Sequence, residues 1–217
     1  MKGKKIQANI LSTVLIPNGD PDLLKSLNVP EGYRSLGLIT TDIDDISYVA
    51  LDEATKNAEV EVVYADSMYA GAANASTKLA GEFIGVLAGP DPEAVKSGIG
   101  AMEYFIENEG FFYSANDEET IPYFAHCVSR PGKYLSELAD THGQEAIAYL
   151  IAPPSEAIYG IDQALKMAEV TLKVFYGPPS HTNFAGALLA GSQEACRAAC
   201  EAFAEAVCQV AAAPLMI

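Results

Sequence analysis

Two stretches decide the fold: Asp52-Glu-Ala-Thr-Lys-Asn-Ala-Glu-Val60 and, 110 positions later, Asp162-Gln-Ala-Leu-Lys-Met-Ala-Glu-Val170. Six of the nine positions carry the same residue, where unrelated segments of average composition share about one. The match continues downstream, because Phe83-Ile-Gly-Val-Leu-Ala-Gly89 is similar to Phe184-Ala-Gly-Ala-Leu-Leu-Ala-Gly191. The sequence is therefore an internal duplication that covers most of the chain.

Apolar runs and helical periodicity predict the same order of elements in each copy. The first copy predicts strands at 10–16, 36–39, 60–64 and 82–88, and helices at 46–58 and 92–106. The second predicts strands ending at 128 and at 146–151, 171–176 and 183–190, with helices at 153–168 and 192–211. We therefore expect an α+β fold of two tandem ferredoxin-like sandwich domains, at residues 1–113 and 114–217.

Polar residues at the expected helix starts suggest how each helix is capped. Asp44 or Asp45 is the expected N-cap of the first helix. Asp91 followed by Pro92 has the pattern of an N-cap and a first helical residue. Ser192, after a glycine, is the expected cap of the last helix.

The net charge of −16, from 29 acidic and 13 basic residues, limits the kinds of partner that the chain can bind. Such a field repels nucleic acid and anionic lipid, and it favours cationic or neutral partners. No apolar run reaches the roughly 18 residues that a membrane span needs, and the first residues do not begin a secretory signal. We expect a cytoplasmic protein that binds neither nucleic acid nor membrane.

The sequence contains no glycine-rich nucleotide-binding motif, no nucleophile elbow and no zinc-protease motif. The three histidines, His126, His142 and His181, lie far apart in the sequence. Cys196 and Cys200 share a helical face, but apolar residues at the same spacing indicate core packing rather than a metal site. We expect no enzyme activity and no bound metal.

Two features are less easily explained by packing alone. Asp42, Asp44 and Asp45 place three carboxylates where a strand ends and a helix begins, which suits either the helix dipole or a small cation. Residues 65–79 form a long Gly- and Ala-rich connection whose counterpart, 177–183, is shorter. Such a loop is typical of a lid or pore rim, and a plain surface loop is the alternative.

The repeated Asp-x-Ala-x-Lys-x-Ala-x-Val motif, the Gly-containing strand and the Glu-Ala-Val or Glu-Ala-Cys of the following helix resemble the bacterial microcompartment shell domain. The strand that ends at Pro17 or Pro131 comes first in each copy, whereas a similar strand comes last in the common shell domain. That order resembles a circularly permuted tandem shell protein. Segments that include 34–39, 69–73, 159–162 and 191–196 are most similar to the EutL-type shell proteins of ethanolamine utilisation.

This resemblance implies a structural role. Such proteins form homotrimers that imitate hexamers and pack with other shell proteins in the shell of a cytoplasmic microcompartment. A gated central pore passes metabolites, and ethanolamine bound in small subunit pores favours the closed state. The resemblance requires no cofactor, and it is compatible with binding or passage of cobalamin.

The resemblance also implies site residues. The ethanolamine contacts carried over are Asp45, Glu82 and the region of Phe112; the pore-rim positions are Tyr69, Ala70, Gly71 and Asn183. Ethanolamine is a cation at pH 7, so carboxylates suit it, and a main-chain carbonyl can accept from its hydroxyl. The repeat pairs Glu82 with a neutral residue near Asn183, so we expect the site in one half only.

Two other classes of function stay open at this point. A soluble small-molecule sensor or regulatory protein built from two similar halves is the first, and it would form discrete particles rather than hexagonal sheets. A lyase or deaminase acting on ethanolamine is the second, and the missing cofactor motif weighs against it.

Overall fold

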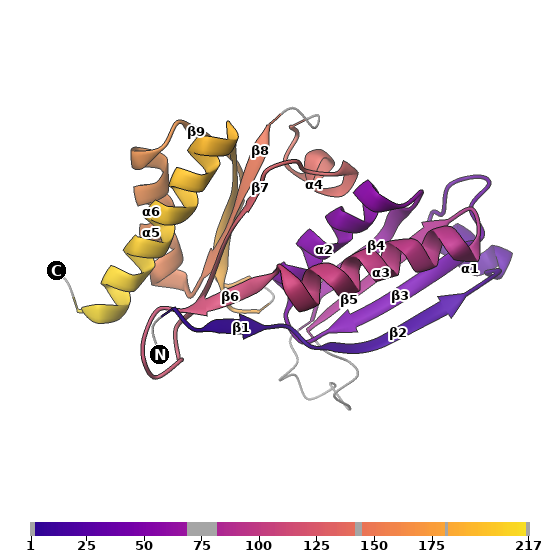
Figure 1. Cartoon of the computed structure of the whole chain (residues 1–217), viewed down its shortest axis with the longest axis horizontal. Helices are drawn as coiled ribbons and strands as arrows, with labels where there is room; N and C mark the ends of the chain where they lie inside the picture. Colours follow the sequence, from indigo (N-terminus) through magenta and orange to yellow (C-terminus); the bar gives the residue numbers. More distant parts are fainter. Residues whose placement is uncertain (1–2, 69–81, 142–144, 181, 216–217) are drawn as a thin grey trace. The chain divides into compact units, whose positions relative to one another are not determined.

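The computed structural model describes residues 3–68, 82–141, 145–180 and 182–215 (Figure 1). Internal contacts divide the chain into two compact units, and neither unit is continuous in sequence. Unit 1 combines the N-terminal residues up to Gln7 with Phe111–Pro131 and the chain from Leu135 onward. Unit 2 comprises Ala8–Gly110 and the short segment Gly132–Tyr134.

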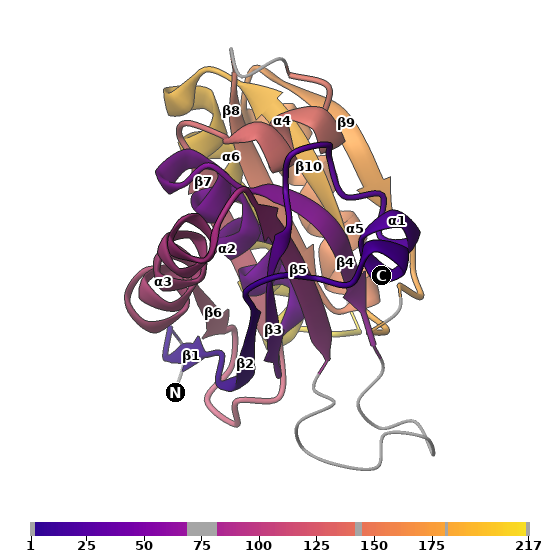
Figure 2. The same ribbon diagram turned by 90° about the vertical axis from the view of Figure 1, so that its right-hand side faces the viewer.

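Unit 2 is a four-stranded antiparallel sheet with two long helices on one face. Its elements are β2 (Ile10–Ile16), α1 (Pro21–Ser26), β3 (Ser35–Thr41), α2 (Asp44–Asn57), β4 (Glu61–Ser67), β5 (Phe83–Gly89) and α3 (Pro92–Asn108). The strand order is β2-β3-β5-β4. Helices α2 and α3 pack against each other and on the sheet, and Figure 2 shows them side by side next to the strands.

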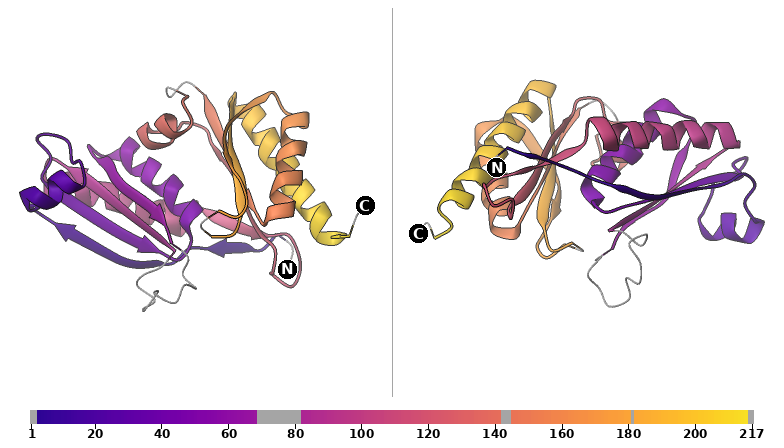
Figure 3. Two further views of the ribbon diagram at one scale, coloured as in Figure 1. Left: turned by 180° about the vertical axis from the view of Figure 1, so that it is seen from behind. Right: turned by 60° about the horizontal axis from the view of Figure 1, so that its bottom comes forward.

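Unit 1 repeats this plan and adds two short strands. Its elements are β1 (Lys5–Gln7), β6 (Phe111–Ser114), β7 (Pro122–Val128), α4 (Lys133–Leu138), β8 (Ala146–Ala152), α5 (Pro154–Met167), β9 (Val170–Tyr176), β10 (Ala185–Gly191) and α6 (Gln193–Ala212). The strand order is β1-β6-β7-β8-β10-β9. Helices α5 and α6 cover one side of this sheet, as the left view of Figure 3 shows.

The order β7-β8-β10-β9 in unit 1 has the same topology as β2-β3-β5-β4 in unit 2. The predicted fold class, two tandem α+β sandwiches of one type, is therefore confirmed. The contact-based units differ from the single expected cut after residue 113, because β1 pairs with β6 and brings the N-terminal residues into unit 1. Ile6 lies opposite Phe112 in that antiparallel pair.

Helices α5 and α6 approach each other closely at a glycine. Gly160 of α5 lies under the ring of Phe203 of α6, and a Cβ at Gly160 would sit 2.6 Å from that ring.

Helices α3 and α6 each begin with a side-chain N-cap. Asp91 accepts hydrogen bonds from the main-chain N–H groups of Glu93 and Ala94, both at 2.9 Å, and Ser192 accepts one from Ala195. The sequence predicts both of these N-caps. Among the described residues, no helix combines the length and the apolar character that crossing a membrane requires.

Candidate functional site

The acidic stretch Asp42–Asp45 joins the end of β3 to the start of α2. The Asp42 carboxylate accepts two hydrogen bonds from Asn9, one from its main-chain N–H and one from its Nδ2, both at 2.7 Å. Asn9 lies directly before β2, so Asp42 ties the two neighbouring strands together at this end of the sheet. Its carboxylate has a structural role that the sequence alone does not reveal.

Asp44 and Asp45 are both only 7% exposed, which is unusual for carboxylates. The prediction that one of them caps α2 is wrong: Ile43 is the N-cap, with extended backbone angles and no side-chain cap. The chain therefore enters the helix before Asp44, and both aspartates lie in the first turn. There, the N-terminal end of the helix dipole favours their negative charge.

Glu82 lies beside this stretch because of the pairing of β3 with β5. Its main-chain N–H donates to Thr41 O at 2.8 Å, and its carbonyl accepts from the N–H of Met68 at 2.6 Å. Burial of the half-buried side chain, together with the Asp44 and Asp42 carboxylates, raises the pKa of Glu82 to about 7. The structure thus brings Glu82 into the electrostatic reach of Asp44 and Asp42.

Tyr48 and Ser67 are polar neighbours of this carboxylate group that sequence reasoning missed. The Tyr48 hydroxyl and the Ser67 hydroxyl lie 2.9 Å apart in a hydrogen bond. Burial raises the pKa of Tyr48 to about 12, opposed by that hydrogen bond and reinforced by the nearby carboxylates Asp44, Asp66 and Asp45. The sequence gives only a weak indication of this pair. Tyr48 follows Asp45 by three residues, which places both on one face of a helix, and Ser67 is the last residue of β4.

Phe112, the third predicted ethanolamine contact, belongs to unit 1 rather than unit 2. It lies on β6, and its buried ring stacks on Phe124 with centroids 5.2 Å apart. Its side chain is therefore core, which leaves its main chain as the part that can contact a ligand. Asp45 and Glu82 share unit 2, and the role of Phe112 stays a prediction.

The predicted pore-rim residues divide into two groups. Tyr69, Ala70 and Gly71 lie outside the described residues. Asn183 is exposed and has a left-handed backbone (φ 68°), and its N–H donates to Ser180 O at 3.1 Å. The expected strand at 183–190 is corrected at its start, because Asn183 belongs to this turn and β10 begins at Ala185.

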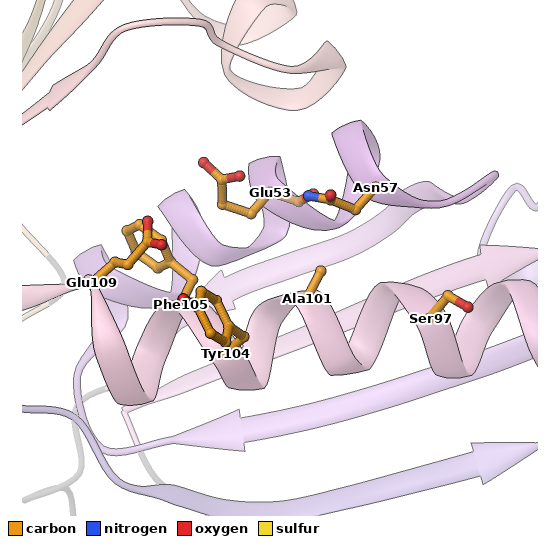
Figure 4. A pocket seen from close by; sticks show the side chains of 7 residues that line it. All are labelled: Glu53, Asn57, Ser97, Ala101, Tyr104, Phe105 and Glu109. Atoms are coloured by element: carbon orange, nitrogen blue, oxygen red, sulfur yellow. The ribbon is translucent and has the colours of Figure 1, made fainter.

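A surface groove of about 450 Å³ lies between α2 and α3 (Figure 4). Glu53 and Asn57 line it from α2; Ser97, Ala101, Tyr104, Phe105 and Glu109 line it from α3 and the residue after it. It contains none of the predicted site residues. Glu53 is eight positions beyond Asp45, which places it about 12 Å further along the helix.

The cysteines and the described histidine behave as packing residues. Cys196 and Cys200 are buried in the core of unit 1, as predicted from their spacing with apolar neighbours. The His126 ring stacks on Phe124 at 5.6 Å. His142 and His181 lie outside the described residues, and the described ranges hold no group of three His, Cys, Asp or Glu arranged for a metal ion.

The repeated sandwich and the acidic helix start occur together in a known family of proteins. The family model of the BMC domain matches residues 35–118, which run from β3 past β6. Together with the second copy of the same sheet order, this match defines the class of the protein. It is a bacterial microcompartment shell protein built from two tandem shell domains.

Full-length relatives give the family. The bacterial microcompartment shell protein EutL of Clostridium perfringens is 58% identical over 99% of both chains. EutL of Escherichia coli is 48% identical over 97% of this chain and 96% of its own. The crystal structure of the ethanolamine utilization protein EutL from Leptotrichia buccalis superimposes with a TM-score of 0.97 at 59% identity, covering both chains completely. The chain belongs to the EutL family, whose role in the shell is structural.

Proposed function

We propose that three copies of the chain form one pseudohexagonal tile of the shell of an ethanolamine-utilisation microcompartment. The internal duplication supports this, because each chain supplies two sandwiches of the same topology and three chains supply six. The tile packs beside other shell proteins in a cytoplasmic microcompartment. The chain then has a structural and gating role without a catalytic step.

We further propose that ethanolamine binds at the carboxylates around the start of α2 and regulates a central pore. The observation that carries this is the placement of Asp44, Asp45 and Glu82 in one unit, with both aspartates buried and the Glu82 pKa raised to about 7. Carboxylates that repel one another away from water favour a bound cation. A primary ammonium has three donors, which suits several carboxylate oxygens at once.

Gating follows if ethanolamine binds the closed pore more tightly than the open one, since a ligand shifts an equilibrium only by its differential affinity. Tyr69, Ala70, Gly71 and Asn183 are the proposed rim of that pore, and a contact of the ligand with the main chain near Phe112 stays a prediction from the resemblance. Passage of cobalamin through the open pore stays a prediction from the resemblance.

Calorimetric titration with ethanolamine at pH 8 tests the binding site. Asp45→Asn and Glu82→Gln should each weaken binding about 10- to 100-fold, since a hydrogen bond to a charged group contributes about 1.5–3 kcal/mol. Glu93→Gln, an exposed change on α3, is the matched control and should leave the affinity unchanged.

Ethylene glycol, which has the same hydroxyl but no ammonium, should not bind to the wild-type chain. If both site variants bound ethanolamine with wild-type affinity, or if the two ligands bound equally well, the carboxylates would not belong to the binding site.

A further inference from the structure

The short helix α1 of unit 2 ends in a turn that is apolar on its inner side. Asn28 has a left-handed backbone (φ 53°), and the Val29 N–H donates to Leu24 O at 3.0 Å. This is the hydrogen bond of a Schellman turn, in which apolar side chains near these positions commonly pack together. Leu24 and Val29 both pack against the apolar cluster around Leu36. Unit 2 therefore closes this turn with apolar side chains.

Helix α4 of unit 1 ends in the same turn, but with hydroxyls in place of those side chains. Asp140 has the left-handed backbone (φ 48°), and the Thr141 N–H donates to Ser136 O, again at 3.0 Å. The two turns therefore match residue for residue. Ser136 stands where unit 2 has Leu24. Thr141 stands where unit 2 has Val29.

Both hydroxyls of the α4 turn are buried. Ser136 is 9% exposed and Thr141 is 3% exposed. Within the part of the chain that the structure describes, neither side-chain oxygen has a hydrogen-bond partner. A buried hydroxyl without a partner destabilises a folded protein, and such groups are rare. Two of them on one turn point to a small molecule that bonds to both.

The strand beside the turn shows the same change from apolar to polar. Val63 of β4 and Lys173 of β9 correspond, because each lies at the irregular position of its strand pairing. Val63 packs against the apolar cluster of unit 2. The Lys173 ammonium instead donates to Asp140 O at 3.3 Å and lies 3.7 Å from a carboxylate oxygen of Glu145. The α4 turn thus has a polar environment where the α1 turn has an apolar one.

The side chains at the α4 turn are also smaller than those at the α1 turn. Ser136 and Ala139 each stand where unit 2 has a leucine, and both have fewer side-chain atoms. Tyr149 of β8 is larger than its counterpart, but its ring packs edge-on against Phe124, with centroids 5.6 Å apart. Phe124 pairs with Ile151, at the end of β8 away from the turn. The lost leucine atoms therefore leave room for a molecule as small as water.

We infer that the α4 turn encloses a water molecule that bonds to the Ser136 and Thr141 hydroxyls. A buried water makes about three hydrogen bonds to groups that otherwise have no partner, and each hydroxyl can donate or accept. A cation would lie near the Lys173 ammonium, and an anion would lie near the Glu145 carboxylate, so an uncharged molecule suits the charges best. The water takes the place of the apolar side chains that close the turn in unit 2.

A crystal structure of the full chain, at a resolution that shows ordered waters, tests this directly. We expect a density peak about 2.5–3.0 Å from both hydroxyl oxygens. The α1 turn in the same crystal is the internal control and should have no peak beside Leu24 and Val29. The absence of a peak at the α4 turn, or a peak at both turns, would overturn the inference. A peak ringed by six or more oxygens at about 2.3–2.6 Å would be a cation and would overturn it as well.

Thermal unfolding of Thr141→Val adds a test that depends on the sign of the change. Valine keeps the shape of threonine without its hydroxyl, so a bound water would lose a partner and the Tm should fall by about 2–4 °C. A Tm that stays the same or rises would mean that the hydroxyl had no partner, and it would overturn the inference. Thr171→Val, the same change at an exposed threonine of β9, is the matched control and should leave the Tm nearly unchanged.

The double variant Ser136→Leu, Thr141→Val gives the α4 turn the side chains of the α1 turn. Its crystal structure should show no peak at the turn, because the added leucine atoms fill the space and both hydroxyls are gone. Circular dichroism checks that it folds. A double variant that keeps the peak would overturn the assignment of the water to these two hydroxyls.

Discussion

Buried carboxylates that lie close together are the feature on which the binding proposal depends at the scale of single residues. Asp44 is almost inaccessible, and Glu82 feels its charge and that of Asp42. Asp42 is held by Asn9, whereas burial and the charges of Asp44 and Asp42 raise the pKa of Glu82. A bound ammonium would reverse this balance by favouring the ionised form of Glu82.

The raised pKa of Glu82 predicts how stability depends on pH without ligand. The folded chain holds the Glu82 proton up to about pH 7, whereas the unfolded chain releases it near its ordinary value of 4.5. The contribution of this group is therefore complete below pH 4.5 and is lost as the pH rises through 7. Glu82→Gln should remove that part of the pH dependence, so that thermal unfolding between pH 5 and pH 8 shows a smaller fall in Tm than in wild type.

Adding ethanolamine at pH 8 should raise the wild-type Tm and leave that of Glu82→Gln nearly unchanged. An identical pH profile in both proteins would mean that Glu82 is not the group that titrates.

The sequence predicts single residues well where the rule is local. Asp91 and Ser192 cap their helices because a cap bonds N–H groups two or three residues away. The proximity of Glu82 to Asp42 and Asp44 is different, because about 40 residues separate them along the chain. It depends on the register of β3 with β5, in which Thr41 lies opposite Phe83.

Helix glycines give the clearest prediction at the scale of elements. A Cβ at Gly160 in α5 would meet the Phe203 ring, whereas a Cβ at Gly100 in α3 has no atom within 4 Å. Gly160→Ala should therefore destabilise the fold by about 1–3 kcal/mol through overpacking. Gly100→Ala should stabilise it by about 0.5–1 kcal/mol, because alanine loses less conformational freedom in a helix.

Denaturant unfolding of the two variants checks this pair. Equal shifts of the midpoint would contradict the packing of α5 against α6. Each variant is the control for the other, since both changes add one methyl group to a helix interior.

Elements with several turns or alternations were predictable, and very short ones were not. The strand at 10–16 and the long helices follow their periodicities closely. In contrast, β1, β6, α1 and α4 have three to six residues, too few to show a period. The pairing of β1 with β6 joins segments about 100 residues apart, and that pairing is why the units cross the expected boundary.

At the scale of the whole molecule, the duplication explains why the chain contains two sandwiches of one topology. These two sandwiches account for the match to the shell-domain family, and the face of α2 that carries Asp52 has a counterpart on α5 that differs in exposure. Asp52 and Asp162 show this most simply, since the same residue is buried in one copy and exposed in the other.

Electron microscopy of the purified chain, concentrated until it assembles, tests the central claim that this protein is a shell tile. The account predicts flat sheets on a hexagonal lattice, in which each tile has threefold symmetry and contains three chains. Discrete particles that form no lattice at any concentration would contradict it, and they are the result expected of a soluble small-molecule sensor.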